Sequence, residues 1–222
     1  MVRTVTLDPR AVTACYRRLL AHWGPQHWWP GETPFEVMVG AVLTQNTAWS
    51  NVERAIANLR AADALDPAAI AAMDRKRLGV LLRPAGYFNV KARRLQAFCR
   101  WYLRRGGFDA LAREPTDTLR RELLAVHGVG PETADDVLLY AFERPVFVVD
   151  AYTRRLFSRL GWVPADIGYE PLRHAVERAL GPDVAVFNEF HALIVRHGKT
   201  TCRPRPLCAG CVLHAGCGFA GS

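Results

Sequence analysis

Four cysteines stand close together near the end of the chain and could hold a metal centre. Cys202, Cys208, Cys211 and Cys217 are separated by five, two and five residues. Four thiolates in one short basic segment are typical of a [4Fe–4S] cluster. Zinc is the second interpretation, although four-cysteine zinc sites usually pair two C-x2-C knuckles and this segment has one. Disulfides are the third.

Two glycines lie between two amphipathic segments of the chain and could bind an anion. Gly128 and Gly130 would allow a tight turn with positive φ and the close approach of another backbone. Pro131, which follows directly, suits the first position of a helix. The amides of such a turn and helix start form an anion site, and a DNA phosphate is the anion that suits a basic chain. Many helix hairpins, however, use glycine for packing alone.

A single carboxylate, Asp150, follows the hydrophobic segment 146–149 and directly precedes a segment with helical periodicity. The simplest interpretation of this residue is a helix N-cap. The functional alternative is a carboxylate held at the mouth of a cleft by the apolar residues behind it.

The segments that must position these groups are helical. Hydrophobic residues recur at helical spacing, with short breaks rich in Gly, Pro and Asp between them. Examples are Phe35, Met38, Val39, Val42 and Leu43; Leu119, Leu123 and Val126; and Phe187, Phe190 and Ile194. The last of these helices is expected to stop at Gly198 as a C-cap. Only residues 146–149 could form a strand, so the sequence predicts an all-α protein with about ten short helices.

Composition adds a candidate partner. The 222 residues are 50% hydrophobic, which suffices for one large domain or two small ones. Lysine and arginine outnumber aspartate and glutamate 29 to 21, for a formal net charge of +8. All of these basic residues except Lys76, Lys91 and Lys199 are arginine, which binds phosphate in bidentate fashion. An arginine-biased genome would explain part of this count, so the charge favours nucleic acid without proving it.

The compartment is predicted from what the sequence lacks. It has no apolar run long enough to cross a membrane, and its first residues lack the apolar segment of a secretory signal. We therefore expect a cytoplasmic protein, associated with the nucleoid if the source is bacterial. In a reducing compartment clustered cysteines favour metal binding, and the isolated Cys15 and Cys99 are expected to be buried, inert thiols.

Taken together, three ordered motifs make the chain resemble the helix-hairpin-helix DNA glycosylase superfamily, in its iron–sulfur-bearing, endonuclease III-like branch. The matching segments are 127–134, 148–150 and the four terminal cysteines, and residues 33–49 (TPFEVMVGAVLTQNTAW) also match. The resemblance covers nearly the whole chain. It implies two helical domains flanking a DNA-binding cleft. A six-helix barrel domain with the hairpin is expected at 26–144, and a cluster domain at 1–25 and 145–222.

Two departures from the family pattern change what the resemblance implies. The family's commonest spacing places six residues between its first two cysteine ligands, and this chain has five. Bifunctional members also carry a lysine two residues after the second hairpin glycine, whereas this chain has Glu132. A carboxylate cannot form a Schiff base, so the lyase step is expected to be absent. The remaining chemistry is similar to that of the 3-methyladenine DNA glycosylases of this branch.

The resemblance also implies roles for residues at the reacting base. Asp150 would stabilise the oxocarbenium-like transition state and position water. Trp28, Trp29 and Trp49 lie in the two regions that form an aromatic pocket in alkylbase-specific relatives, where ring faces attract cationic bases. Large core residues are the alternative interpretation of these tryptophans. Gln45 and Tyr87 occupy the positions that approach the gap left by a flipped base.

Phosphate contacts are expected from the hairpin and from basic residues around the cysteine segment. The expected DNA-binding residues are Gly128, Gly130, Arg196, Lys199, Arg203 and Arg205. Asp135 and Asp136 are interpreted as favourable charges near the start of the second hairpin helix rather than as a catalytic pair.

The sequence therefore predicts a monomeric, monofunctional DNA glycosylase of base excision repair that flips and hydrolyses alkylated purines from damaged duplex DNA, with 3-methyladenine as first choice. One alternative is an endonuclease III-like glycosylase for oxidised pyrimidines or mismatched bases. A second is a non-catalytic, damage-binding iron–sulfur protein, and a third is a redox protein whose basic charge is incidental. The catalytic interpretation of Asp150 disfavours the second, and the hairpin motif disfavours the third.

Overall fold

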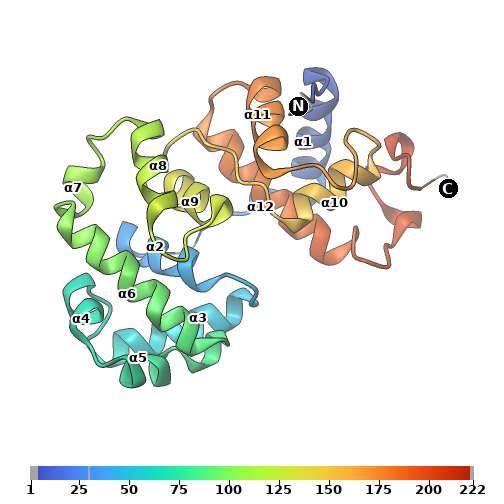
Figure 1. Cartoon of the computed structure of the whole chain (residues 1–222). Helices are drawn as coiled ribbons and strands as arrows, with labels where there is room; N and C mark the ends of the chain where they lie inside the picture. The colour runs from blue at the N-terminus through green and yellow to red at the C-terminus, as the bar shows by residue number, and fades with distance from the viewer. Residues whose placement is uncertain (1–4, 30, 221–222) are drawn as a thin grey trace. The chain divides into compact units, whose positions relative to one another are not determined.

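The structure, a computed structural model, describes residues 5–29 and 31–220, and all regular elements of that part of the chain are helical (Figure 1). The all-α prediction is confirmed, with twelve α-helices in the described residues where about ten were expected. The α-helices are α1 Pro9–Trp23, α2 Pro34–Leu43, α3 Trp49–Ala61, α4 Pro67–Ala72, α5 Arg75–Leu81, α6 Phe88–Arg104, α7 Gly107–Leu111, α8 Thr116–Ala125, α9 Pro131–Asp136, α10 Ala151–Arg159, α11 Tyr169–Leu180 and α12 Val184–Thr200. Within these described ranges, none of the helices combines the length and apolarity of a membrane span.

The chain divides into two compact units, and the boundaries fall at Trp28/Trp29 and Arg144/Pro145. The first, here the hairpin unit, is Trp29–Arg144 and contains α2 to α9. The second, here the terminal unit, joins the described residues up to Trp28 with those from Pro145. In the terminal unit α1 packs against α11 and α12, so segments from both chain ends share one core. Figure 1 shows this pairing as a blue helix beside orange ones.

The hairpin unit is built around α2. Thr33 caps this helix by accepting a hydrogen bond from the Glu36 amide, and Pro34 takes the first helical position. Every residue from Glu36 to Leu43 is buried, and all of them except Glu36 lack a polar side chain, which is typical of a central helix. It packs against α3, α6, α9 and a π-helical turn at Val137–Ala141.

Residues 146–149, the only candidate strand in the sequence, are buried but not paired in a sheet. The Phe147 amide donates to Glu177 Oε1 at 3.0 Å, and the Val149 amide donates to the Tyr169 hydroxyl at 3.4 Å. Two amides of this extended segment thus donate hydrogen bonds to side chains of α11, as they would to the carbonyls of a neighbouring strand.

The expectation that α12 stops at Gly198 is wrong. The helix continues to Thr200, and Gly198 lies inside it. A Cβ at Gly198 would come 2.5 Å from Cδ1 of Tyr152, so glycine is required here for the close packing of α10 on α12. In a sequence, a single glycine can indicate either a helix C-cap or a close contact between helices, and the two cannot be told apart.

Candidate functional site

The hairpin turn connects α8 to α9, and its two glycines have different roles. Gly128 has a φ of +87°, and an added Cβ would come 2.2 Å from Cγ of Arg94. Gly130 has a φ of −98° and no heavy atom within 4 Å of an added Cβ. It is also the N-cap of α9 and provides no side chain to cap the helix. Gly128 is therefore required by the fold, whereas the start of α9 at Gly130 has open space beside it.

A buried ion pair joins the two helices of the hairpin. Arg120 on α8 donates from Nε and a terminal nitrogen to the two oxygens of Asp135 on α9, at 2.7 and 3.1 Å. The Asp135 side chain is fully buried. Its role is thus more specific than the helix-start charge expected from the sequence, because this bidentate pair fixes how α8 and α9 lie against each other.

Gln45, expected to approach the gap in the duplex, is tied to the hairpin. Its Nε2 donates to the Gly128 carbonyl and to Thr133 Oγ1, both at 2.9 Å, and its Oε1 accepts from the Arg94 guanidinium. The amide therefore connects the end of α2 to both sides of the hairpin turn. Nothing in the sequence pointed to Arg94, because it is one of many arginines.

Tyr87 lies at the start of α6 with its side chain exposed. Its φ is +45° and the residue is 73% exposed, which is unusual for a large aromatic. Behind it, the buried Lys91 donates from Nζ to the Ala85 carbonyl at 2.7 Å, which anchors the preceding turn. Burial, with a smaller contribution from Arg94, lowers the pKa of Lys91 to about 8. The structure thus holds the backbone of this loop while leaving the Tyr87 ring in solvent.

Three aromatic rings gather beside α2 in the hairpin unit. The ring centroids of Trp29 and Trp49 are 4.8 Å apart, and those of Trp29 and Tyr140 are also 4.8 Å apart. Gly40 makes room for this cluster, since a Cβ there would come 3.2 Å from both tryptophan rings. Tyr140 was missed by sequence analysis because it lies on the π-helical turn, whose register the hydrophobic pattern does not reveal.

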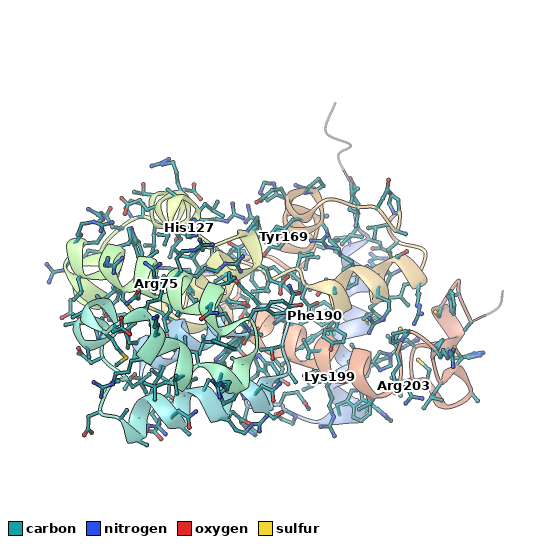
Figure 2. All side chains as sticks on the ribbon, turned by 60° about the horizontal axis from the view of Figure 1, so that its bottom comes forward. Arg75, His127, Tyr169, Phe190, Lys199 and Arg203 are labelled. Atoms are coloured by element: carbon teal, nitrogen blue, oxygen red, sulfur yellow. The ribbon has the colours of Figure 1, made fainter. Side chains whose placement is uncertain are left out.

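Trp28 belongs to the terminal unit, where Lys199 Nζ lies 5.8 Å from the centroid of one of its rings. Arg196 is placed similarly, 5.3 Å from a ring centroid of Trp23. Both cations are exposed at the end of α12, and so are Arg203 and Arg205 in the loop that follows. Figure 2 shows Lys199 and Arg203 in this part of the chain. The terminal unit thus presents four cations around the cysteine segment.

Asp150 caps α10, as its simplest interpretation predicts. Its Oδ1 accepts hydrogen bonds from the amide and the hydroxyl of Thr153, at 2.7 and 2.9 Å. Its Oδ2 lies 3.6 Å from Nε2 of His191 on α12. Burial acts to raise the pKa of this carboxyl, but His191 and Thr153 outweigh it and the pKa lies below its usual value. Asp150 is therefore a buried, ionised carboxylate with one oxygen used by the helix cap.

The four terminal cysteines line a single apolar cavity together with Leu156, Leu213 and His197. Burial raises the pKa of Cys211, and the three other thiols add to this effect although a backbone hydrogen bond from Leu213 opposes it. Arg159 donates to Cys202 Sγ at 3.4 Å and to the Arg203 carbonyl at 2.6 Å, which ties α10 to the loop. Cys15 and Cys99 are buried elsewhere, as expected, and burial raises the pKa of each to about 12.

The spacing of these thiols bears on which metal centre they fit. In the described part of the chain, no three His, Cys, Asp or Glu side chains are grouped closely enough to hold one metal ion. A four-cysteine zinc site needs all its sulfurs about 2.3 Å from a single ion. Four cysteine thiols around one apolar cavity are also the donor set that a [4Fe–4S] cluster takes.

Comparison with known proteins agrees with this geometry. The sequence profile of the HhH-GPD superfamily base excision DNA repair proteins matches residues 39–182. A protein of Methanocaldococcus jannaschii, named provisionally as a DNA repair glycosylase, is 47% identical over 91% of this chain and 93% of its own length. Endonuclease III of Thermotoga maritima is 32% identical over 84% of this chain and 83% of its own.

Solved structures show the same fold. The Helicobacter pylori 3-methyladenine DNA glycosylase bound to 1,N6-ethenoadenine has a TM-score of 0.75 and 29% identity, covering 87% of this chain and 98% of its own. A non-covalent endonuclease III–DNA complex has a TM-score of 0.83 and 22% identity, and the match covers 97% of this chain and 98% of that chain. The chain belongs to the HhH-GPD superfamily of base excision DNA repair proteins and is one of its helix-hairpin-helix DNA glycosylases.

Proposed function

We propose that this glycosylase is monofunctional and releases positively charged alkylated purines, 3-methyladenine first, by hydrolysis of the N-glycosidic bond. The observation that carries the proposal is the cluster of Trp29, Trp49 and Tyr140 beside α2, in the same unit as the hairpin. Cationic rings are attracted to aromatic faces. Methylation at N3 or N7 puts positive charge on the purine, so binding to such a cluster selects the base that already leaves most readily.

The proposed role of Asp150 is electrostatic. Cleavage of the bond to the base gives the sugar oxocarbenium character, and a fixed carboxylate stabilises that charge. Because Thr153 holds Oδ1, the carboxylate keeps one orientation, and its lowered pKa keeps it ionised at neutral pH. The same charge would orient the attacking water. Helix capping and catalysis are compatible here, since they use different oxygens of one side chain.

The absence of a lyase step is proposed from Glu132. This exposed residue stands two positions after Gly130, where the bifunctional relatives carry their lysine. A carboxylate cannot attack the sugar as an amine. Lys91 is a poor substitute, because its Nζ is buried and already donates to the Ala85 carbonyl. The expected product is therefore an intact abasic site.

DNA binding is proposed to use both units. The open start of α9 at Gly130 would accept a phosphate, and the exposed Arg196, Lys199, Arg203 and Arg205 would position the backbone without reading sequence. Tyr87 would enter the space left by the flipped base, because its ring is exposed on an anchored loop. Gln45 would hold the hairpin in place beside it.

A [4Fe–4S] cluster is the proposed cofactor, held by Cys202, Cys208, Cys211 and Cys217. When bound, such a cluster supplies a rigid cross-link and the possibility of electron transfer; no step of base release uses it. The chain itself also fixes this loop. Arg159 on α10 donates hydrogen bonds to Cys202 Sγ and to the carbonyls of Arg203 and Pro204, which holds the loop against α10.

The alternative function is that of an endonuclease III-like enzyme acting on oxidised pyrimidines or mismatched bases. The Thermotoga maritima relative favours it, since that protein is named as endonuclease III and is 32% identical. A non-catalytic damage-binding protein is disfavoured, because the chain belongs to a superfamily of base excision DNA repair proteins and is 47% identical to a protein named provisionally as a glycosylase.

The deciding experiment offers the purified protein a panel of duplexes of one sequence, each with one lesion: an alkylated purine, thymine glycol, uracil or a mismatch. Released bases are identified by chromatography, and each strand is analysed with and without alkali. We expect release of the methylated purine and a strand that breaks only after alkali. Excision of thymine glycol or uracil with no release of methylated purine would overturn the proposed specificity.

A further inference from the structure

His191 is a buried histidine that no sequence motif marks. It lies on the apolar helix α12 and is 4% exposed. The Phe147 ring stands edge-on to it, with ring centroids 6.5 Å apart. Its Nε2 lies 3.6 Å from Oδ2 of Asp150. The side chain is thus enclosed by packing, with one nitrogen directed at the carboxylate of the proposed reaction.

The two oxygens of Asp150 have separate neighbours. Both hydrogen bonds from Thr153 go to Oδ1, whereas Oδ2 faces His191. A buried carboxylate without a compensating donor or positive charge takes up a proton, and then loses the charge that stabilises an oxocarbenium ion. The state of Oδ2 therefore depends on the imidazole beside it.

Two other polar side chains from the helices around Asp150 and His191 have contacts of their own with other groups. Tyr169 on α11 places its hydroxyl 3.4 Å from the Val149 amide. Arg154 on α10 lies with its guanidinium 6.0 Å from the Tyr169 ring centroid. The group that faces Oδ2 from α12 is His191, whose Nε2 lies 3.6 Å away.

We propose that His191 is a positioning residue for base release, holding Oδ2 of Asp150 so that the carboxylate remains ionised and aimed at the sugar. The proposal rests on the proposed function, in which Asp150 carries the reaction. In this proposal α12 positions the catalytic carboxylate as well as carrying the exposed Arg196 and Lys199 near its end.

Two substitutions test it. His191→Phe keeps a ring of similar size but has no donor, and His191→Gln offers an amide that can reach the same oxygen. We expect single-turnover release of methylated purine to fall about tenfold or more in His191→Phe, because the substitution leaves a buried carboxylate oxygen without its polar neighbour. The acid limb of its pH–rate profile should move to higher pH, and His191→Gln should retain most of the rate. Binding to undamaged duplex should be unchanged in both.

A double-mutant cycle separates positioning from packing. If His191 acts through Asp150, His191→Phe will slow release in the wild-type background and have no further effect in Asp150→Asn. A His191→Phe enzyme with the wild-type rate and acid limb would overturn the proposal. So would an equal additional loss in the Asp150→Asn background.

A stability measurement needs no activity and separates failure of this proposal from failure of the proposed function. Asparagine caps a helix as well as aspartate, so Asp150→Asn mainly removes charge. With His191 present, the lowered pKa means that the ionised carboxylate stabilises the fold at pH 7, and Asp150→Asn should lower Tm. In His191→Phe only the Thr153 hydrogen bonds oppose the effect of burial, so the same substitution should lower Tm less than in the wild-type background, or raise it. An equal or larger fall of Tm in the His191→Phe background would overturn the proposal even if the enzyme proved inactive on every lesion tested.

Discussion

Replacing each hairpin glycine by alanine separates what the fold requires from what DNA binding requires. At Gly130 the backbone has φ −98° and ψ 178°, which any residue adopts, and an added Cβ meets nothing within 4 Å. Gly130→Ala should therefore fold normally. Alanine restricts the unfolded chain more than glycine does but is a poorer N-cap, and these opposing effects should leave the free energy of unfolding within about 1 kcal/mol of the wild-type value.

The same methyl group should weaken DNA binding. It would occupy the open space at the start of α9 through which a phosphate reaches the backbone amides. Loss of one hydrogen bond to a charged group is worth about 2 kcal/mol, which corresponds to roughly thirtyfold in Kd. The variant should thus keep nearly the stability of the wild type and bind undamaged duplex more weakly.

Gly128→Ala is the matched control, two residues away in the same turn. Its φ of +87° costs an L-residue about 1–2 kcal/mol, and the new Cβ would displace the Arg94 side chain, now 2.2 Å from that position. Here the fold should lose about 2 kcal/mol or more of stability.

Urea unfolding and fluorescence anisotropy with an undamaged duplex, at one fixed salt concentration, measure the two effects. Unchanged DNA affinity in Gly130→Ala would refute the assignment of a phosphate to this turn. Equal destabilisation by both substitutions would refute the distinction between the two glycines.

Three further predictions concern the cofactor, the lyase step and the base pocket. Protein purified without oxygen should be brown and contain about four iron atoms per chain, as a [4Fe–4S] centre requires; one zinc and no iron would contradict the cluster assignment. Borohydride should trap no covalent adduct with DNA, since Glu132 cannot form the required Schiff base; efficient trapping would show that another amine has taken the role. Trp49→Ala should slow release of a cationic purine by about two- to thirtyfold, from a loss of about 0.5–2 kcal/mol, while binding to undamaged duplex stays the same; equal losses in both assays would assign Trp49 to packing alone.

The all-α fold could be predicted from the sequence because its helices bury regular apolar stripes. The stripe at Leu119 and Leu123 marks α8, and Pro131 marks the first residue of α9. The helix end expected at Gly198 was wrong, because the same glycine serves the contact with Tyr152. A glycine in a sequence indicates that the fold needs either an unusual backbone conformation or a close contact at that position. It does not show which of the two is needed.

The site was predictable only where a motif fixes the local backbone. The hairpin glycines and Asp150 have such motifs, and both lie where local structure requires them. Tyr140, Lys91 and His191 have none, because each gains its neighbours through tertiary packing: a π-helical turn, a buried loop carbonyl and an apolar helix face. Their sequence neighbourhoods resemble those of ordinary helix residues.

The most direct test of the central claim compares the wild-type protein with Asp150→Asn on DNA treated with a methylating agent, under single-turnover conditions. Asparagine keeps the cap of α10 and removes the charge, so the variant should still fold, with a lowered Tm, and bind DNA as the wild type does. We predict that the wild type releases 3-methyladenine and leaves an intact abasic site, and that the variant is slower by about 10²-fold or more, as for loss of a preorganised electrostatic partner. Wild-type protein that releases no methylated purine, or a variant that keeps the wild-type rate, would contradict it.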